Sequence, residues 1–165
     1  MKATELLKKQ HRAVEKLFGE LKKLDGPARR PVMDQISEEL AHHMAIEEDI
    51  FYPAVRELDT KKTEEMIPEA IEEHHVVKLV LKEIPLVDPE DERFEAKMTV
   101  LEEFIEHHVE EEEKEMFKAA ESLGDVRLRE LGALMESRNG PQRGGDNGAS
   151  APPQQSAHSH SERHI

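Results

Sequence analysis

Apolar side chains recur three and four residues apart in four stretches of the chain, and short connections containing Pro, Gly or clustered polar residues separate these stretches. Such spacing places the apolar side chains of each stretch on one face of an α-helix. The predicted helices cover residues 4–24, 31–53 and 65–85, and a fourth opens at residues 88–90 and extends past residue 116. Pro53 is expected to kink or end the second helix. Four amphipathic helices with short connections predict an all-α, antiparallel up-down-up-down four-helix bundle.

The composition suits a helical core and indicates how the rest of the chain is organised. Hydrophobic residues make up 36% of the chain but aromatic residues only 4%, so Leu, Ile, Val and Met must fill the interior. Residues 126–135 predict a short fifth helix on the outside of the bundle. From residue 139 onward the sequence is rich in Gly, Pro, Ser and Gln, which predicts disorder. We therefore expect a bundle over residues 1–122, an accessory helix over 123–138 and a disordered tail over 139–165.

The charge balance and the absence of cysteine exclude several classes of function. Acidic residues outnumber basic ones 37 to 23, for a net charge of −14, which argues against a nucleic-acid partner. With no cysteine, the chain has no disulfide, thiolate metal site or iron–sulfur cluster. No signal-peptide pattern and no apolar run of about 20 residues is present, so we expect a cytoplasmic protein without a membrane span. The sequence indicates no particular oligomeric state.

One histidine falls on the inward face of each predicted helix, and the second and fourth helices add a glutamate. The histidines lie 32, 31 and 34 residues apart, about one helix and one turn, so an antiparallel bundle brings them to a similar height. Each glutamate follows its histidine by four residues, which points both side chains the same way. The candidate metal ligands are His11, His43, Glu47, His74, His108 and Glu112.

Three of these histidines belong to His-His doublets, so a choice has to be made within each doublet. Residues 43–52 align without gaps against residues 108–117, and both segments end in an aromatic residue. For the two doublets in these segments, the alignment favours the second histidine, that is, His43 over His42 and His108 over His107.

In the third helix, Ile71 and Val77 are expected on the buried face, which favours His74 over His75. The neighbours His75 and His107 remain open as alternative ligands.

Two adjacent cations would explain why a bundle places imidazoles and carboxylates on its inward faces. Such groups without partners would strongly penalise the core, and a metal pair removes that penalty. A carboxylate can bind both ions and offset their repulsion, while imidazoles fill terminal positions. Six protein ligands leave positions for an oxo or hydroxo bridge, water or an external ligand. Mixed nitrogen and oxygen ligation favours two non-haem iron ions, with manganese or zinc as alternatives.

The pattern H…HxxxE…H…HxxxE resembles that of the hemerythrin-like, or HHE cation-binding, family. The resemblance extends over residues 3–120, with local similarity at residues 47–53 and 73–78. It implies a hemerythrin-like bundle with a non-haem di-iron site and a bridging oxygen species. Members of this family bind O2, process H2O2 or NO, sense oxygen or handle iron.

The chain departs from the oxygen-carrying hemerythrins at two positions. Those proteins carry a second histidine one turn further along the third helix, where this chain has Lys78. Their fourth helix uses His-x4-Asp, whereas His108 and Glu112 are four residues apart and only His107 would fit the longer spacing. A site with fewer imidazoles is more open, which favours redox turnover or sensing; iron storage or reversible O2 binding is the alternative. The single tyrosine, Tyr52, is expected to pack at a helix end.

Overall fold

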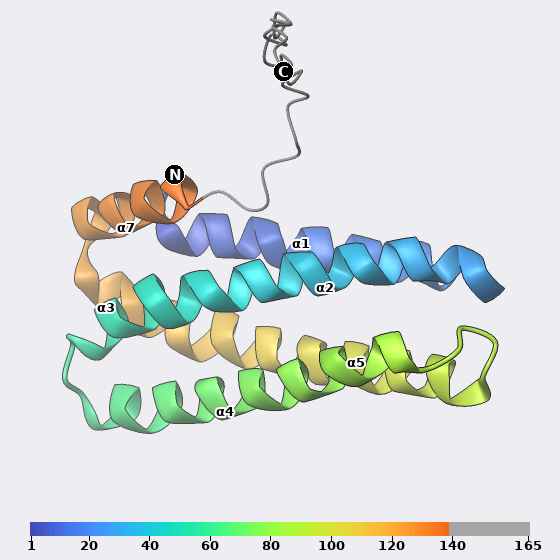
Figure 1. Cartoon of the computed structure of the whole chain (residues 1–165). Coiled ribbons are helices and arrows are strands. Elements are labelled where there is room, and N and C mark those ends of the chain that lie inside the picture. The colour runs from blue at the N-terminus through green and yellow to red at the C-terminus, as the bar shows by residue number, and fades with distance from the viewer. Residues whose placement is uncertain (139–165) are drawn as a thin grey trace, which may run out of the picture.

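The computed structural model describes residues 1–138, and the predicted disordered tail lies outside the described residues. Four helical rods run side by side, and a fifth helix packs on the outside of the bundle near one end (Figure 1). The first and third rods are the single helices α1 (Ala3–Leu21) and α4 (Lys61–Glu83). The second comprises α2 (Arg29–Ile46), η2 (Glu47–Phe51) and α3 (Tyr52–Arg56), and the fourth comprises α5 (Glu92–Glu111), η4 (Glu112–Met116) and α6 (Phe117–Ala120). The fifth helix is α7 (Asp125–Ser137). The predicted all-α bundle with an additional C-terminal helix is confirmed.

Two predicted helix starts are wrong by several residues because side chains cap the helices elsewhere. The third helix starts at Lys61 rather than near residue 65, since the Thr60 hydroxyl accepts a hydrogen bond from the Thr63 N–H at 3.1 Å. The fourth starts at Glu92 rather than at residues 88–90, because the Asp91 carboxylate accepts from the Arg93 N–H at 2.9 Å.

Pro53 does not end the second rod, because a π-helical turn precedes it. In η2 the Tyr52 N–H donates to the Glu47 carbonyl, one residue further back than in an α-helix. The hydrogen-bond register changes there, and Pro53 falls in the first turn of α3, where proline is tolerated. The fourth rod has the same irregularity in η4, where the Phe117 N–H donates to the Glu112 carbonyl. Both π-helical segments begin at a candidate ligand glutamate.

The core consists of two apolar clusters separated by a polar layer. Along α1, Leu7 belongs to one cluster and Val14 to the other, with His11 between them. The same order holds on α4, where His74 separates Ala70 from Val77. The cluster next to α7 contains Phe51 and Phe117, and the cluster at the opposite end contains Phe18, Phe94 and Met33. The polar layer therefore crosses the bundle between its two apolar ends.

One residue that was expected on the buried face of the third helix is exposed instead. Ile71 is 38% exposed, and Ala70 occupies the buried position instead. This change does not alter the choice within the doublet, because His74 is 1% exposed whereas His75 lies on the exposed face.

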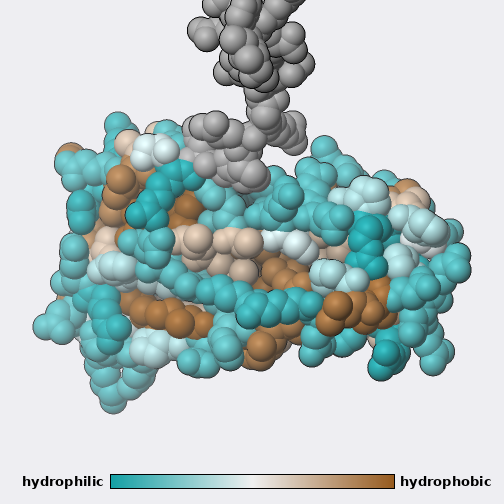
Figure 2. Space-filling view, viewed as in Figure 1, coloured by the Kyte–Doolittle hydropathy of each residue, from teal (hydrophilic) through white to brown (hydrophobic). Residues whose placement is uncertain are grey.

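The surface seen in Figure 2 is mainly hydrophilic, with apolar side chains in narrow strips. Within residues 1–138, no helix has both the length and the apolar character that a membrane crossing requires.

Gly132 allows α7 to lie directly against the start of α1. A Cβ atom at this position would overlap the Met1 carbonyl oxygen and lie 3.0 Å from the Ala3 nitrogen. We expect Gly132→Ala to lower the free energy of unfolding by about 1–3 kcal/mol, because the two backbones must separate. Gly19→Ala is the control: nothing lies within 4 Å of a Cβ there, so the better helix propensity should raise stability by about 0.5–1 kcal/mol. Urea unfolding measures both, and equal stability of the two variants would contradict the close packing of α7.

Candidate metal centre

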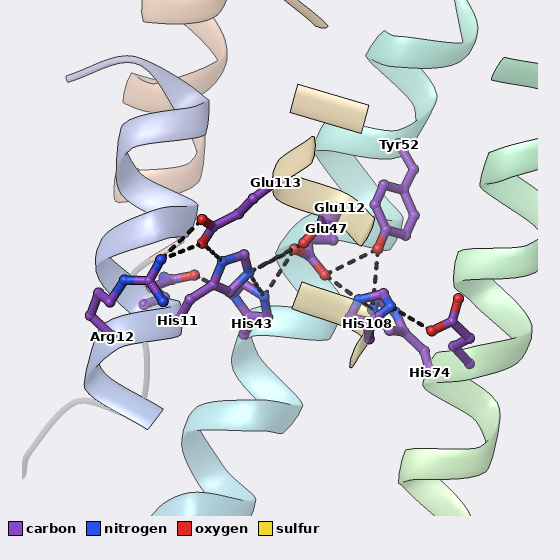
Figure 3. Close-up of polar contacts among 11 residues, drawn as sticks. His11, Arg12, His43, Glu47, Tyr52, His74, His108, Glu112 and Glu113 are labelled. Carbon is purple, nitrogen blue, oxygen red and sulfur yellow. Dashed lines mark hydrogen bonds and ion pairs between the residues drawn. The ribbon is translucent and has the colours of Figure 1, made fainter. Parts of the chain in front are cut away.

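All six predicted ligand side chains meet in the polar layer. They come from all four rods, and none is more than 8% exposed. Figure 3 shows Glu47 and Glu112 at the centre, with one pair of histidines on either side. The structure thus brings together every residue of the predicted set.

The donor atoms form two groups that share Glu47. One group comprises His11, His43, Glu47 and Glu112, and the other comprises Glu47, His74 and His108. Within each group the donor atoms lie within 4.8 Å of one another.

The two carboxylate oxygens of Glu47 face different groups. Oε1 lies 2.9 Å from Nε2 of His43, and Oε2 lies 3.1 Å from Nε2 of His74. Glu112 joins the first group, with its Oε2 3.2 Å from Nε2 of His11. A carboxylate held between two sets of imidazoles has the arrangement of a bridge between two cations.

The histidines of each pair turn their Nε2 atoms toward each other. These atoms are 3.1 Å apart in His11 and His43, and 3.2 Å apart in His74 and His108. Two nitrogens bound at right angles to one ion at about 2.1 Å would lie about 3.0 Å apart. The spacing within both pairs therefore fits neighbouring ligands of a single ion.

Each Nδ1 atom is held by a side chain that the sequence pattern does not single out. In each case the supporting residue is adjacent in sequence to a ligand on a different rod. The Nδ1 contacts are His43 to Gln10 at 2.7 Å, His74 to Glu48 at 2.9 Å, His108 to Glu73 at 3.1 Å and His11 to Glu113 at 2.9 Å. Each rod therefore supports the histidine of the next rod, and the fourth supports the first. We call these four residues the supporting ring.

The supporting ring determines which nitrogen of each imidazole is free. An acceptor at Nδ1 favours the tautomer with the proton on that atom, which leaves the Nε2 lone pair facing the centre. Basic residues in turn hold two of the ring carboxylates: Lys78 lies 2.8 and 2.9 Å from Glu48, and Arg12 lies 3.0 Å from Glu113. Lys78 occupies the position at which the oxygen carriers have a histidine. Through its contact with Glu48, which holds His74, it supports the site indirectly.

The buried charges depend strongly on one another. Burial raises the pKa of Glu112, and the charge of Glu47 raises it further. Burial opposes charge on His108, but the hydrogen bond to Glu73 and the carboxylates of Glu112 and Glu47 raise its pKa to about 9. Glu112 Oε1 accepts no hydrogen bond from any residue between 1 and 138. A buried oxygen without a donor is strongly disfavoured unless a cation contacts it, so the site fits a metal.

Tyr52 packs at a helix end as expected, but it also reaches the centre. The side chain is 1% exposed, and its hydroxyl lies 3.2 Å from Nε2 of His74 and 3.3 Å from Oε2 of Glu47. Burial raises the pKa of Tyr52 well above its usual value, with a further contribution from the charge of Glu47, so the phenol stays protonated. A protonated hydroxyl can donate a hydrogen bond within the site.

The alternative histidines point away from the centre. His75 and His107 are exposed, and His107 lies 3.3 Å from Glu111 on the outer face of α5. Neither belongs to the two groups of converging donor atoms.

A cavity of about 150 Å³ adjoins the centre on the side away from α7. All four candidate histidines contribute to its wall, together with apolar side chains such as Val14, Phe18 and Leu40. This volume is enough for several water molecules or for a small neutral molecule beside the Nε2 atoms.

Comparisons with known proteins identify a cation-binding domain family and a structure with the same fold. The family described as Hemerythrin HHE cation binding domain matches residues 2–120. A crystal structure of a hemerythrin HHE cation binding domain-containing protein from Mycobacterium kansasii has a TM-score of 0.73 to this chain and 27% sequence identity. The match covers 84% of this chain and 85% of that one.

A curated relative from Nostoc sp., named DNA nickase, is 28% identical over 124 residues. The match covers 72% of this chain but 33% of the relative, so this chain spans about a third of that protein's length.

Proposed function

This chain belongs to the hemerythrin HHE cation-binding domain family, and we propose that it holds two non-haem iron ions that react with O2, H2O2 or NO. The observation that supports a pair of ions, rather than one, is the position of Glu47. Its two oxygens face two separate sets of imidazoles, 2.9 Å from His43 and 3.1 Å from His74. A single ion cannot use both sets at ordinary ligand distances.

In this proposal the two ions have unequal protein ligand sets. His11, His43, Glu47 and Glu112 bind one ion, and Glu47, His74 and His108 bind the other. Six-coordinate ions would then keep two and three open positions, one of each filled by an oxo or hydroxo bridge. Imidazole and carboxylate together favour iron, with manganese and zinc as the alternatives that metal analysis separates.

The chain's own residues prepare the site for a small ligand. With a metal bound, the supporting ring would keep the four Nε2 lone pairs directed inward, and the cavity leaves room for a small ligand beside them. The Tyr52 hydroxyl is placed to donate a hydrogen bond next to Glu47. A bound iron pair supplies two linked redox centres that exchange electrons with a ligand held there.

The environment of Lys78 supports turnover or sensing rather than reversible O2 carriage. Its ammonium group pairs with Glu48, so it neither fills a metal position nor adds an imidazole. The ion bound by His74 and His108 therefore keeps the larger number of open positions.

Metal analysis of the full chain tests the proposal first. After purification from iron-replete cells, we expect about two iron ions per chain, as the two donor groups require. Fewer than about one transition-metal ion per chain would refute the metal centre.

A reaction with hydrogen peroxide then separates the possible roles. Sustained oxygen evolution, followed with an oxygen electrode, indicates an enzyme. A stable change in the visible spectrum without gas release indicates binding or sensing, and no response to peroxide, O2 or NO would leave iron storage or handling as the function.

A further inference from the structure

A second cavity, of about 310 Å³, reaches the candidate metal centre from another side. It lies between α4 and the α5–η4 segment, and His108 and Glu112 form its inner wall. Five further glutamates line it, together with one lysine, Lys62. These glutamates are Glu65, Glu69, Glu73, Glu111 and Glu115. We call this cavity the acidic groove.

The glutamates of the acidic groove form two facing rows. Glu65, Glu69 and Glu73 repeat every four residues along α4, and Glu111 and Glu115 have the same spacing on the opposite rod. Glu65 and Glu111 each pair with a basic residue one turn earlier, Lys61 and His107. Glu69 and Glu73 have no basic residue three or four positions away, and like charges at this spacing destabilise a helix, so helix stability does not explain these two. Lys62 pairs with Glu115 at the outer part of the groove, whereas Glu69 has no ion-pair partner within residues 1–138.

Three of the groove carboxylates are close enough to hold one cation. Oxygen atoms of Glu69, Glu73 and Glu111 lie within 4.8 Å of one another. Glu73 also contacts His108 Nδ1 at 3.1 Å, so this cluster lies one side chain away from the candidate centre.

Glu112 provides an independent sign that the groove receives a cation. Its side chain is buried, with the residue 3% exposed, and it lines the inner end of the groove. Its Oε1 accepts no hydrogen bond from any described residue. The cavity on the other side has three glutamates in its wall, of which Glu15 pairs with Arg12 and Glu102 with Lys22. The groove has five glutamates besides Glu112, so it offers more carboxylates to a cation that loses its water.

We propose that the acidic groove is the path by which a divalent cation such as Fe²⁺ reaches the centre, with a transient site formed by Glu69, Glu73 and Glu111. Carboxylate oxygens replace water ligands one at a time along the rows, and Glu112 receives the ion at the inner end. The cation and the neutral small ligand then use different openings. This inference rests on the proposed metal centre.

The rate of iron uptake by the metal-free full chain tests the path. Fe²⁺ is added without oxygen at low ionic strength, samples are quenched with a strong chelator, and protein-bound iron is measured against time. The variant Glu69→Gln/Glu111→Gln should slow uptake at least about threefold, because focused negative charge speeds cation capture. Its final iron content should equal that of the wild type, since neither residue belongs to the six candidate ligands.

The matched control is Glu20→Gln/Glu38→Gln, which makes the same charge change at exposed positions on α1 and α2. It should take up iron at nearly the wild-type rate. Equal slowing in both double variants would show that only net charge matters, and wild-type uptake in the groove variant would also overturn the path. A wild-type chain that retains no iron would instead refute the proposed centre, and this inference with it.

A binding measurement tests the transient site without any loaded centre. In a Glu47→Gln background, electron paramagnetic resonance should detect one weak Mn²⁺ site per chain. Adding Glu69→Gln/Glu111→Gln should abolish that site, whereas adding Glu20→Gln/Glu38→Gln should leave it. Persistence of the weak site in the groove variant would overturn the assignment to these carboxylates.

Discussion

Replacing Glu47 with glutamine is expected to remove most of both ions of the proposed metal pair. Glu47 is the one residue common to the two groups of donor atoms, and it is 0% exposed. Glutamine keeps the shape of the side chain but removes the negative charge that offsets the repulsion between two adjacent cations. We therefore expect the content to fall from about two ions to fewer than about 0.5 per chain, since both donor groups lose their shared anion.

Thermal unfolding should also reveal the loss of metal in Glu47→Gln. An ion present at a thousandfold excess over its dissociation constant stabilises the folded protein by about 4 kcal/mol. The melting temperature of the wild type should thus fall when a chelator is added, whereas that of Glu47→Gln should hardly respond. Comparing each variant with and without chelator separates the metal contribution from the effect of the substitution on the metal-free fold.

Glu72→Gln is the control for Glu47→Gln, because Glu72 is an exposed glutamate on α4 outside both donor groups. Its metal content and its response to chelator should match the wild type. Two ions retained in Glu47→Gln would show that this carboxylate does not bridge the pair.

Helical periodicity was enough to locate the polar layer in the sequence. On α1 and α5 the predicted inward histidines, His11 and His108, are both buried, as the spacing of their apolar neighbours predicts. Ile71, which was expected on the buried face, is exposed. Ala70 and Ile71 are adjacent apolar residues in one turn of α4, and helical periodicity does not indicate which of the two faces the core. The choice of His74 nevertheless agrees with its burial.

The supporting ring could not be predicted, since it depends on the handedness of the bundle. Gln10, Glu48, Glu73 and Glu113 each lie one position before or after a candidate ligand, which rotates them by about 100° around the helix. Periodicity places them beside the polar layer but does not tell which neighbouring rod they face. Isolated glutamates at such positions look the same as a solvated helix surface.

The two π-helical segments could not be predicted from the spacing of apolar residues. Each adds one residue to a turn that begins at a candidate ligand glutamate, so the pattern before and after it still looks helical. The gapless alignment of residues 43–52 with 108–117 shows only that the two rods share a local structure. It does not show that this structure departs from an α-helix.

Replacing His108 with alanine is expected to remove one of the two ions and leave the other. His108 belongs to the group with only three protein ligands, where the loss of one imidazole leaves Glu47 and His74. Even substitutions of supporting residues at metal sites cost about 10–100-fold in affinity, so loss of a ligand should weaken this ion by at least about 100-fold. The group of four ligands does not include His108, so about one ion per chain should remain.

His107→Ala is the matched control, since it changes the neighbouring residue of the same doublet. The His107 side chain is 64% exposed and loses only a surface contact with Glu111, so both ions should stay bound. Metal analysis and the response of the melting temperature to chelator measure both variants. The reverse result, with loss in His107→Ala and retention in His108→Ala, would mean that the fourth helix uses the longer spacing to Glu112. In that case α5 would have to rotate by about 100° from the orientation described here, because adjacent residues of a helix point in different directions.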